Sequence, residues 1–182
     1  MNKKKGFNEY EIRENISIIF LKDRYNKILA EAIIDTSRLD FIENMGLSFH
    51  AHWNSHTNSY YARTTIYLGI INGRRAYKTL CLHQILLETD KTVDHINTNS
   101  LDNRMENLRE TTINKNSSNR KSKNRNNTTG VRNVSLINEK YVVQLQINGK
   151  NTRIGKFDNI KDAEIFAKEM REKYYGEFAG NN

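Results

Sequence analysis

The chain has little with which to build disulfides, zinc clusters or membrane spans. It holds one cysteine, Cys81, among 182 residues, which excludes an internal disulfide and any zinc site made of several cysteines. A reducing, cytoplasmic setting fits that composition. No apolar run approaches the roughly eighteen residues of a transmembrane helix, and the basic start MNKKKGFNEY has no apolar stretch behind it. We therefore expect neither a signal peptide nor a membrane span.

Hydrophobic residues are scarce as well. They make up 37% of the chain, and the mean hydropathy is -0.78. A chain of this length holds one full-sized domain or two to three small ones. The composition therefore predicts modest cores and a largely polar surface.

Positive charge is abundant, and it lies mainly in the last third of the chain. Residues 1–113 carry 15 Lys/Arg against 14 Asp/Glu, whereas residues 114–182 carry 14 against 7. Such asymmetry is typical of a polyanion partner, because each Lys or Arg placed on a phosphate releases condensed counterions. The alternative is a basic face that only keeps the protein soluble. Charge alone does not separate DNA from RNA.

The first region, residues 1–58, predicts structure but no function. Residues 16–21 and 28–34 are rich in β-forming side chains and flank a polar turn, which indicates a hairpin. Thr36 or Ser37 is positioned to cap a short helix that ends near Met45. Trp53 and residues 60–68 suggest further strands. The role of this region stays open.

The second region, residues 59–120, contains the polar residues that suggest chemistry. Asn72-Gly73 predicts a tight hairpin turn followed by a strand through Leu80. Residues 82–87 (LHQILL) predict a short apolar helix. The asparagine-rich stretch VDHINTNSLDNRMENLRETTINKNSSN follows.

A basic linker joins this region to the third one. Between Asn114 and Asn133 there are six Lys/Arg, no acid and seven Asn. A stretch without large apolar residues, Val131 apart, cannot bury a core and predicts a linker. Its charge favours a linker that lies along a phosphate backbone over a plain spacer.

The third region, residues 121–182 with a core at 128–179, alternates cleanly. Residues 131–137, 140–147 and 152–157 predict three strands with turns at 138–139 and 148–149. A helix follows from Ile160, with Asn159 as N-cap and Asp162 three residues on. Its apolar face at helical spacing consists of Ile160, Ala163, Phe166, Ala167, Met170 and Tyr174. The prediction is a three-stranded antiparallel sheet covered by one helix.

The pair Asp94-His95 and the residues Asn103, Asn107 and Asn116 are the best candidates for chemistry. Phosphodiester hydrolysis needs a water, a base to take its proton and a cation for the developing charge. Imidazole suits the base, and a carboxylate with an amide oxygen suits Mg²⁺ or Mn²⁺. Taken alone, an Asp-His pair is more often a surface hydrogen bond than a site.

The segments LHQILL, VDHINTNSLDNRMENLR and TTINKNSSN together resemble the HNH signature of phage and intron homing endonucleases over about residues 80–119. That resemblance implies a ββα-metal fold in which His95 is the general base. Asp94 and Asn116 would hold one divalent ion, Mg²⁺ or Mn²⁺, and Asn107 would bond across the loop to keep it in shape. Residues 108–119 would form a helix that brings Asn116 back to the pair.

Two positions depart from this signature. Thr98 stands where the family usually has glycine, so the turn must be made with a side chain present. The last signature position is Asn116 rather than histidine, and Asn114 and Asn119 are rival candidates for it. Both departures concern the geometry around the expected ion.

Other histidines and the cysteine receive plainer interpretations. His83 on the LHQILL helix is expected in the core or at a phosphate rather than in catalysis. His50, His52 and His56 lack a fixed ligand spacing and are expected on the surface. Cys81 is expected as a small core residue.

The C-terminal module resembles a second family. GVRNVSLINEKYVVQLQINGKNTRIGKFDNIKDAEIFAKEM with the ending YYGEFA is similar to the apetala-two/ethylene-response-factor domain, whose three-stranded sheet lies in the DNA major groove. The alternation places Tyr141, Val143, Leu145 and Ile147 toward the helix. The resemblance implies that Arg132, Gln144, Gln146, Asn151 and Arg153 face DNA, where Gln can pair with adenine and Arg with guanine. The family's tryptophans on this face are absent, with Arg153 at one such position.

The sequence therefore predicts a modular α+β protein. Its parts are a β-rich region (1–58), an HNH finger (59–120), and a basic linker with a sheet-reading domain (121–182). The predicted function is a metal-dependent homing-type endonuclease of double-stranded DNA that nicks one strand per monomer, in a bacterial or phage-infected cell. The linker residues expected on DNA are Arg120, Lys121, Lys123 and Arg125. We expect no small-molecule substrate.

Two other functional classes stay open. One is a DNA-binding regulator whose nuclease half has lost activity, although Asp94, His95 and Asn116 are all present. The other is an RNA-binding protein, which the predicted sheet favours less because it lacks the exposed aromatic pair that stacks on RNA bases.

Overall fold

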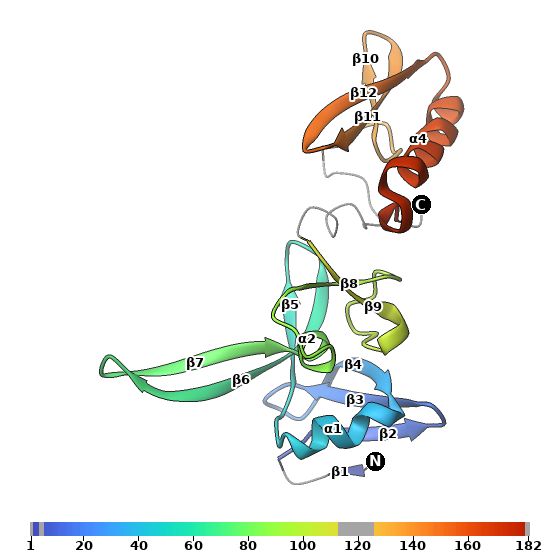
Figure 1. The fold of residues 1–182 in the computed structure, drawn as a ribbon. Coiled ribbons are helices and arrows are strands. Elements are labelled where there is room, and N and C mark those ends of the chain that lie inside the picture. The colour runs from blue at the N-terminus through green and yellow to red at the C-terminus, as the bar shows by residue number, and fades with distance from the viewer. Residues whose placement is uncertain (1, 4–5, 113–125, 181–182) are drawn as a thin grey trace. The chain divides into compact units, whose positions relative to one another are not determined.

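The protein is described from a computed structural model, which covers residues 2–3, 6–112 and 126–180. The fold is mixed α+β, with mostly strands in several small sheets and few helices (Figure 1). The chain divides into two compact units at Thr112/Ile113. None of the described helices is long and apolar enough to cross a membrane.

The first unit starts with an antiparallel sheet in the order β1-β2-β3-β4. Its strands are β1 (Asn2–Lys3), β2 (Glu9–Arg13), β3 (Ile16–Lys22) and β4 (Ile28–Asp35). The predicted hairpin of β3 and β4 is confirmed. A short turn η1 (Thr36–Arg38) and the helix α1 (Leu39–Asn44) follow, as expected.

The expected cap of that helix is wrong. The N-cap position before η1 is Asp35, that before α1 is Arg38, and neither makes a side-chain cap hydrogen bond. The Thr36 hydroxyl instead donates to the Glu14 carbonyl oxygen at 3.1 Å. Packing of Leu39 and Ile42 in the core therefore positions this helix, rather than a capping side chain.

A second sheet in the order β5-β6-β7 continues the unit. It consists of β5 (His50–Asn54), β6 (Ser59–Ile71) and β7 (Arg74–Cys81), with the predicted turn at Asn72-Gly73. The short helix α2 (Leu82–Leu86) follows, and then a two-stranded sheet of β8 (Thr92–His95) and β9 (Leu108–Thr111), with the turn η2 (Met105–Asn107) before β9.

The prediction of a helix from Leu108 is wrong for the described residues. Leu108–Thr111 form the strand β9, in which Leu108 pairs with His95 and Arg109 with Asp94. Leu108 is buried in the core, Arg109 and Thr111 are half-buried, and Glu110 is exposed. Residues 113–119 lie outside the described residues.

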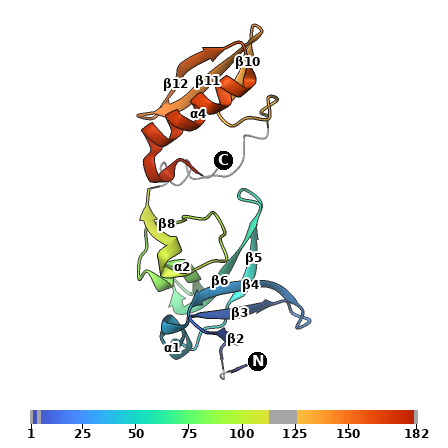
Figure 2. The same cartoon turned by 90° about the vertical axis from the view of Figure 1, so that its right-hand side faces the viewer.

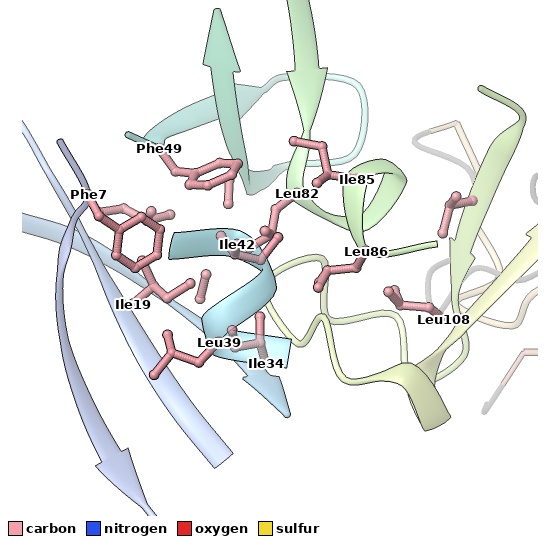
Figure 3. Close-up of a cluster of buried hydrophobic side chains, with 14 residues drawn as sticks. Phe7, Ile19, Ile34, Leu39, Ile42, Phe49, Leu82, Ile85, Leu86 and Leu108 are labelled. Carbon is pink, nitrogen blue, oxygen red and sulfur yellow. The ribbon is translucent and has the colours of Figure 1, made fainter. Parts of the chain in front are cut away.

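One hydrophobic core unites residues 7–108, so the structure does not divide the chain at residue 58. The labelled side chains in Figure 3 converge between the N-terminal sheet, α1, α2 and β9. Ile19, Ile34, Ile42, Leu82 and Leu86 are fully buried there. Burial of each such side chain contributes about 1.5–3 kcal/mol. The β-rich region and the Asp94-His95 region therefore fold as one body.

The second unit is the predicted sheet and helix. The strands β10 (Val134–Ile137), β11 (Lys140–Ile147) and β12 (Lys150–Phe157) are antiparallel in that order. Helix α4 (Ile160–Tyr175) lies along one face of the sheet (Figure 2), and the turn η3 (Gly176–Phe178) follows it. Asn159 caps α4 by accepting from the Lys161 amide at 2.8 Å, as predicted.

Two details of this unit differ from the prediction. Residues 131–133 are not strand, because Val131 accepts a turn bond from the Val134 amide and the ladder begins only there. Tyr174 is exposed, whereas the Tyr175 hydroxyl accepts from the Gln146 amide at 2.9 Å. The helix thus ends with its other tyrosine against the sheet. The core of this unit contains Val134, Val143, Ala163 and Ala167.

Candidate functional site

Asp94 and His95 end strand β8, as the sequence predicted, and both are buried. Strand pairing sets Asp94 opposite Arg109 on β9. The Arg109 guanidinium donates to Asp94 Oδ2 from Nη2 at 2.6 Å and from Nε at 2.8 Å. A charge-assisted pair of this kind fixes the orientation of the carboxylate.

The loop between β8 and β9 is closed by Asn107. Its Oδ1 accepts from the Asn97 amide at 2.8 Å, and its Nδ2 donates to the Asp102 carbonyl oxygen at 2.7 Å. The Asn107 side chain therefore spans the loop from inside, where it is buried.

The turn after His95 carries backbone strain. Thr98 has φ = +62°, a left-handed conformation that costs a residue with a side chain roughly 1–2 kcal/mol. Its amide still donates to the His95 carbonyl oxygen at 2.8 Å. The expectation drawn from the missing glycine, a turn made with a side chain present, describes this geometry.

An ion pair stiffens the middle of the loop. Arg104 donates to both carboxylate oxygens of Asp102 at 2.8 Å, and Asn97 Nδ2 donates to the same group at 2.8 Å. The Arg104 hydrogen bond lowers the pKa of Asp102. The Asp102 carboxylate therefore stays charged well into acid.

The N-terminal sheet holds this loop through backbone hydrogen bonds. The Ile33 amide donates to Leu101 O at 2.8 Å, and the Asn103 amide donates to Ile33 O at 2.7 Å. The Asp35 carboxylate accepts from the Met105 amide at 2.7 Å. Strand β4 thus serves as a template for the loop, a role that sequence analysis did not find.

His95 lies in a cluster of rings with His83 of α2 and Tyr61 of β6. The ring centroids of His83 and His95 are 5.0 Å apart, and Tyr61 lies 5.9 Å from His83 and 6.3 Å from His95. All three contacts are edge-to-face. His83 therefore packs directly against His95, a contact that the sequence did not predict.

Asn103 orients the imidazole of His95. Its Nδ2 donates to Leu101 O at 3.0 Å, which turns its Oδ1 toward His95 Nε2 at 3.4 Å. A neutral ring with its proton on Nε2 satisfies this contact and carries the lone pair on Nδ1. The arrangement can accept a proton at Nδ1.

Burial keeps both imidazoles neutral. It lowers the pKa of His83 to about 3, together with repulsion from any proton on His95 and from Arg63. Burial also lowers the pKa of His95, although the Asn103 hydrogen bond and the carboxylates of Asp94 and Asp102 oppose it. Both rings are uncharged at neutral pH.

The expected metal ligands are only partly within view. Asp94 is described, while Asn116 and its rivals Asn114 and Asn119 lie outside the described residues. In the described part of the chain, no group of three or more His, Cys, Asp or Glu is placed to hold a metal. One carboxylate with an amide suits Mg²⁺, which keeps several waters, and does not suit zinc.

The other histidines and the cysteine belong to no metal-binding group among the described residues. His50 and His56 are exposed, and His52 is half-buried. Cys81 is half-buried and accepts a hydrogen bond from Arg63 Nε at 3.4 Å.

The residues predicted to face DNA form cross-strand neighbours on the second unit. Gln144 pairs with Arg153 and Gln146 with Asn151 across β11 and β12. A register shift between Val143 and Gln144 accompanies this pairing. Gln146, Asn151 and Arg153 are exposed, and Gln144 is half-buried. The linker residues Arg120, Lys121, Lys123 and Arg125 lie outside the described residues.

Arg132 does not fit its expected place on DNA. Its side chain is 5% exposed and donates from Nη1 to the Ala179 carbonyl oxygen at 2.9 Å. Arg171 in turn donates to the Arg132 carbonyl oxygen at 3.3 Å. Arg132 therefore ties the C-terminal turn to the start of the sheet.

Comparison with protein families gives one match, which covers a short segment of the chain. Residues 87–118 match the family model of the HNH endonucleases. The matched segment contains Asp94, His95, Asn103 and Asn107, which share the loop described above. This match supports an HNH nuclease and a nucleic-acid substrate. No curated protein and no solved structure matches the chain.

Sequence analysis missed several residues that shape the site. The sequence contained a hint of Arg109, because a cation two residues after Asn107 can face the Asp94 carboxylate if both residues lie in paired strands. Tyr61 and Asp35 carried none, because their approach depends on how distant strands pack.

Proposed function

We propose that the chain is a metal-dependent, homing-type DNA endonuclease that hydrolyses phosphodiester bonds at a preferred sequence. The observation that carries the proposal is the buried, neutral His95, which Asn103 orients beside Asp94 in the segment that matches HNH endonucleases. A neutral imidazole beside a carboxylate is suited to take a proton from water.

His95 acts as the general base in this proposal. Its Nδ1 accepts the proton of the attacking water, while Nε2 keeps its contact with Asn103. The pKa of His95 is lowered by burial, so the ring is ready to accept a proton at neutral pH. The rings of His83 and Tyr61 pack edge-to-face with the ring of His95 and limit its rotation.

Asp94 and Asn116 would hold the divalent ion, Mg²⁺ or Mn²⁺. Such an ion supplies positive charge to the scissile phosphate and the leaving oxygen. Arg109 donates to Oδ2 of Asp94 and holds the carboxylate in one orientation. Asn107 keeps the loop closed around the pair.

Each chain carries one such site, so a monomer nicks one strand. Cleavage of both strands would need two copies.

The C-terminal unit supplies sequence preference in this proposal, in the manner of an apetala-two-like domain. Gln144, Gln146, Asn151 and Arg153 offer adjacent amides and a guanidinium on one surface, and such groups read base edges in the major groove. The basic linker would meet phosphates, which add affinity without sequence information. Replacing Gln144, Gln146 and Arg153 with Ala should flatten the site preference measured by footprinting.

A plasmid-nicking assay tests the proposal. Relaxed plasmid should accumulate with Mg²⁺ or Mn²⁺ and should not form in excess EDTA. Equal nicking in EDTA would remove the metal from the proposal.

A second candidate is a DNA-binding regulator with an inactive nuclease half. The ion pair between Arg109 and Asp94 favours it, because it engages the expected ligand. Specific DNA binding without nicking in either metal would establish this alternative.

A further inference from the structure

Strands β6 and β7 extend beyond their unit as a long two-stranded arm. Figure 1 shows them running side by side, away from the other elements of the first unit. Thr64 on β6 is the last buried residue of this strand. We call residues 65–79 the arm. It pairs with itself in the described structure, from Thr65 opposite Thr79 to Ile71 opposite Arg74.

The arm carries large apolar side chains in the open. Ile70 is 70% exposed, and Tyr67, Leu68, Ile71 and Tyr77 are each at least half exposed. Tyr67 and Tyr77 lie against each other with ring centroids 5.4 Å apart. A run of exposed apolar residues on a projecting ribbon indicates a binding surface.

The charge of the arm has one sign. Arg74, Arg75 and Lys78 are exposed, and residues 65–79 contain no acid. The rest of residues 1–112 carries 12 Lys/Arg against 14 Asp/Glu. The arm is thus a cationic extension of a unit that is otherwise slightly acidic.

Cations and apolar side chains alternate across both strands at the tip. Ile70 pairs with Arg75, and Ile71 pairs with Arg74, so each face presents one isoleucine and one arginine. A register shift between Tyr67 and Gly69 inserts an extra residue, and Gly69 has φ = +101°. Such a bulge increases the twist of a ribbon.

The base of the arm lies at the candidate site. Tyr61 on β6 contacts the rings of His83 and His95, and β7 ends at Cys81, directly before α2. Ile71 lies ten residues beyond Tyr61 along the strand, a span of about 33 Å. One turn of duplex DNA is about 34 Å long. The arm therefore reaches about one helical turn from His95.

We propose that the arm binds the groove and phosphate backbone of double-stranded DNA next to the position that is cut. Arg74 and Arg75 contact phosphates, while the isoleucines and tyrosines contact sugars and base edges. The major groove admits a two-stranded ribbon of this kind. This inference rests on the proposed nuclease function and adds a DNA-contacting element to the nuclease unit itself.

The same charge argues against pairing with a second copy of the chain. Two arms laid together would bring Arg74, Arg75 and Lys78 against identical cations, with no acid on either arm to neutralise them. A polyanion resolves that repulsion and a second arm does not.

The test compares two hairpin tips of the full chain. One variant carries Arg74→Gln and Arg75→Gln, and its control carries Arg24→Gln and Lys27→Gln at the exposed tip between β3 and β4. Binding to a mixed-sequence duplex of about three turns is measured in EDTA over a range of salt. We expect the arm variant to flatten the plot of log Kobs against log salt by about two units, one for each lost phosphate contact. The control should keep the wild-type slope.

Two further variants separate charge from shape. The variant with Arg74→Lys and Arg75→Lys should have the wild-type salt slope, because it keeps both charges. The variant with Ile70→Ser and Ile71→Ser should bind more weakly but keep the same salt slope. Ile12→Ser on the exposed side of β2 is the apolar control. An unchanged slope in the Gln variant, with a wild-type far-ultraviolet spectrum, overturns the inference.

Sedimentation and nicking complete the test. Sedimentation shows whether the wild-type protein is a dimer. If it is, and if Ile70→Ser with Ile71→Ser dissociates the dimer but leaves DNA affinity unchanged, the arm binds a second copy of the chain and the inference is overturned. Because binding is measured in EDTA, absence of nicking with Mg²⁺ or Mn²⁺ would refute the nuclease proposal alone. Normal nicking with an arm-independent salt slope would refute the arm alone.

Discussion

The buried imidazole of His83 should make the first unit sensitive to mild acid. The pKa of His83 is lowered to about 3 by burial, and by repulsion from any proton on His95 and from Arg63. In the unfolded chain a histidine has a pKa of about 6.5. Between about pH 3 and about pH 6.5, the unfolded state therefore binds a proton at this histidine, whereas the folded state does not.

The sign and size of the effect follow from this difference. A base whose folded pKa is lowered contributes its full stability above the unfolded pKa and loses it as the pH falls. The free energy of unfolding should drop by about 1.4 kcal/mol for each pH unit below about 6.5. At pH 4.5 the loss from His83 alone amounts to about 3 kcal/mol.

The assay compares His83→Gln with wild type in urea titrations from pH 7.5 to pH 4.5. Trp53 is the single tryptophan and lies in β5, so its fluorescence reports the first unit. The glutamine variant has no proton to bind, and its stability should fall less steeply by about 3 kcal/mol over this range.

The slope, rather than the stability at one pH, decides the outcome. His56→Gln, at an exposed position, is the control and should follow wild type. Parallel curves for His83→Gln and wild type would refute the claim that burial keeps His83 neutral.

Three further substitutions test the loop between β8 and β9 and the packing of the second unit. Thr98→Gly should raise the free energy of unfolding by about 1 kcal/mol, because it relieves the positive φ at the cost of some chain entropy; urea titration checks it. Asn107→Ala should lower it by roughly 1–3 kcal/mol for each of the two backbone groups left unpaired, a loss that Trp53 fluorescence would follow. Gly155→Ala should destabilise the second unit by about 1–3 kcal/mol, since a Cβ there would lie 2.7 Å from the rings of Phe157 and Phe166; circular dichroism of helix α4 during melting measures it.

Alternation and turn residues predicted most of the strands. The Asn72-Gly73 turn and the β3/β4 hairpin follow from local chemistry, and the structure has both. The helix α4 follows from the spacing of Ala163 and Ala167 and from the Asn159 cap. These features depend on residues close together in the chain, which is why the sequence alone was enough.

The errors concern contacts between distant segments. Leu108–Thr111 looks helical through its resemblance, yet it pairs with β8 because that sets Leu108 in the core. The template role of β4 operates through the backbone of Ile33 and leaves no mark in side-chain types. Arg132 has the residue type of a DNA contact, but its guanidinium is buried and donates a hydrogen bond to the Ala179 carbonyl oxygen.

The central claim is that His95 performs chemistry rather than binding. His95→Ala should reduce metal-dependent nicking by roughly 10²–10⁴-fold, the usual contribution of one general base, while affinity for the same duplex in EDTA stays within a few-fold of wild type. Asn103→Ala, which frees the imidazole from its orienting contact, should fall between the two. A His95→Ala protein that nicked bound DNA at the wild-type rate, or that lost only affinity, would contradict the account.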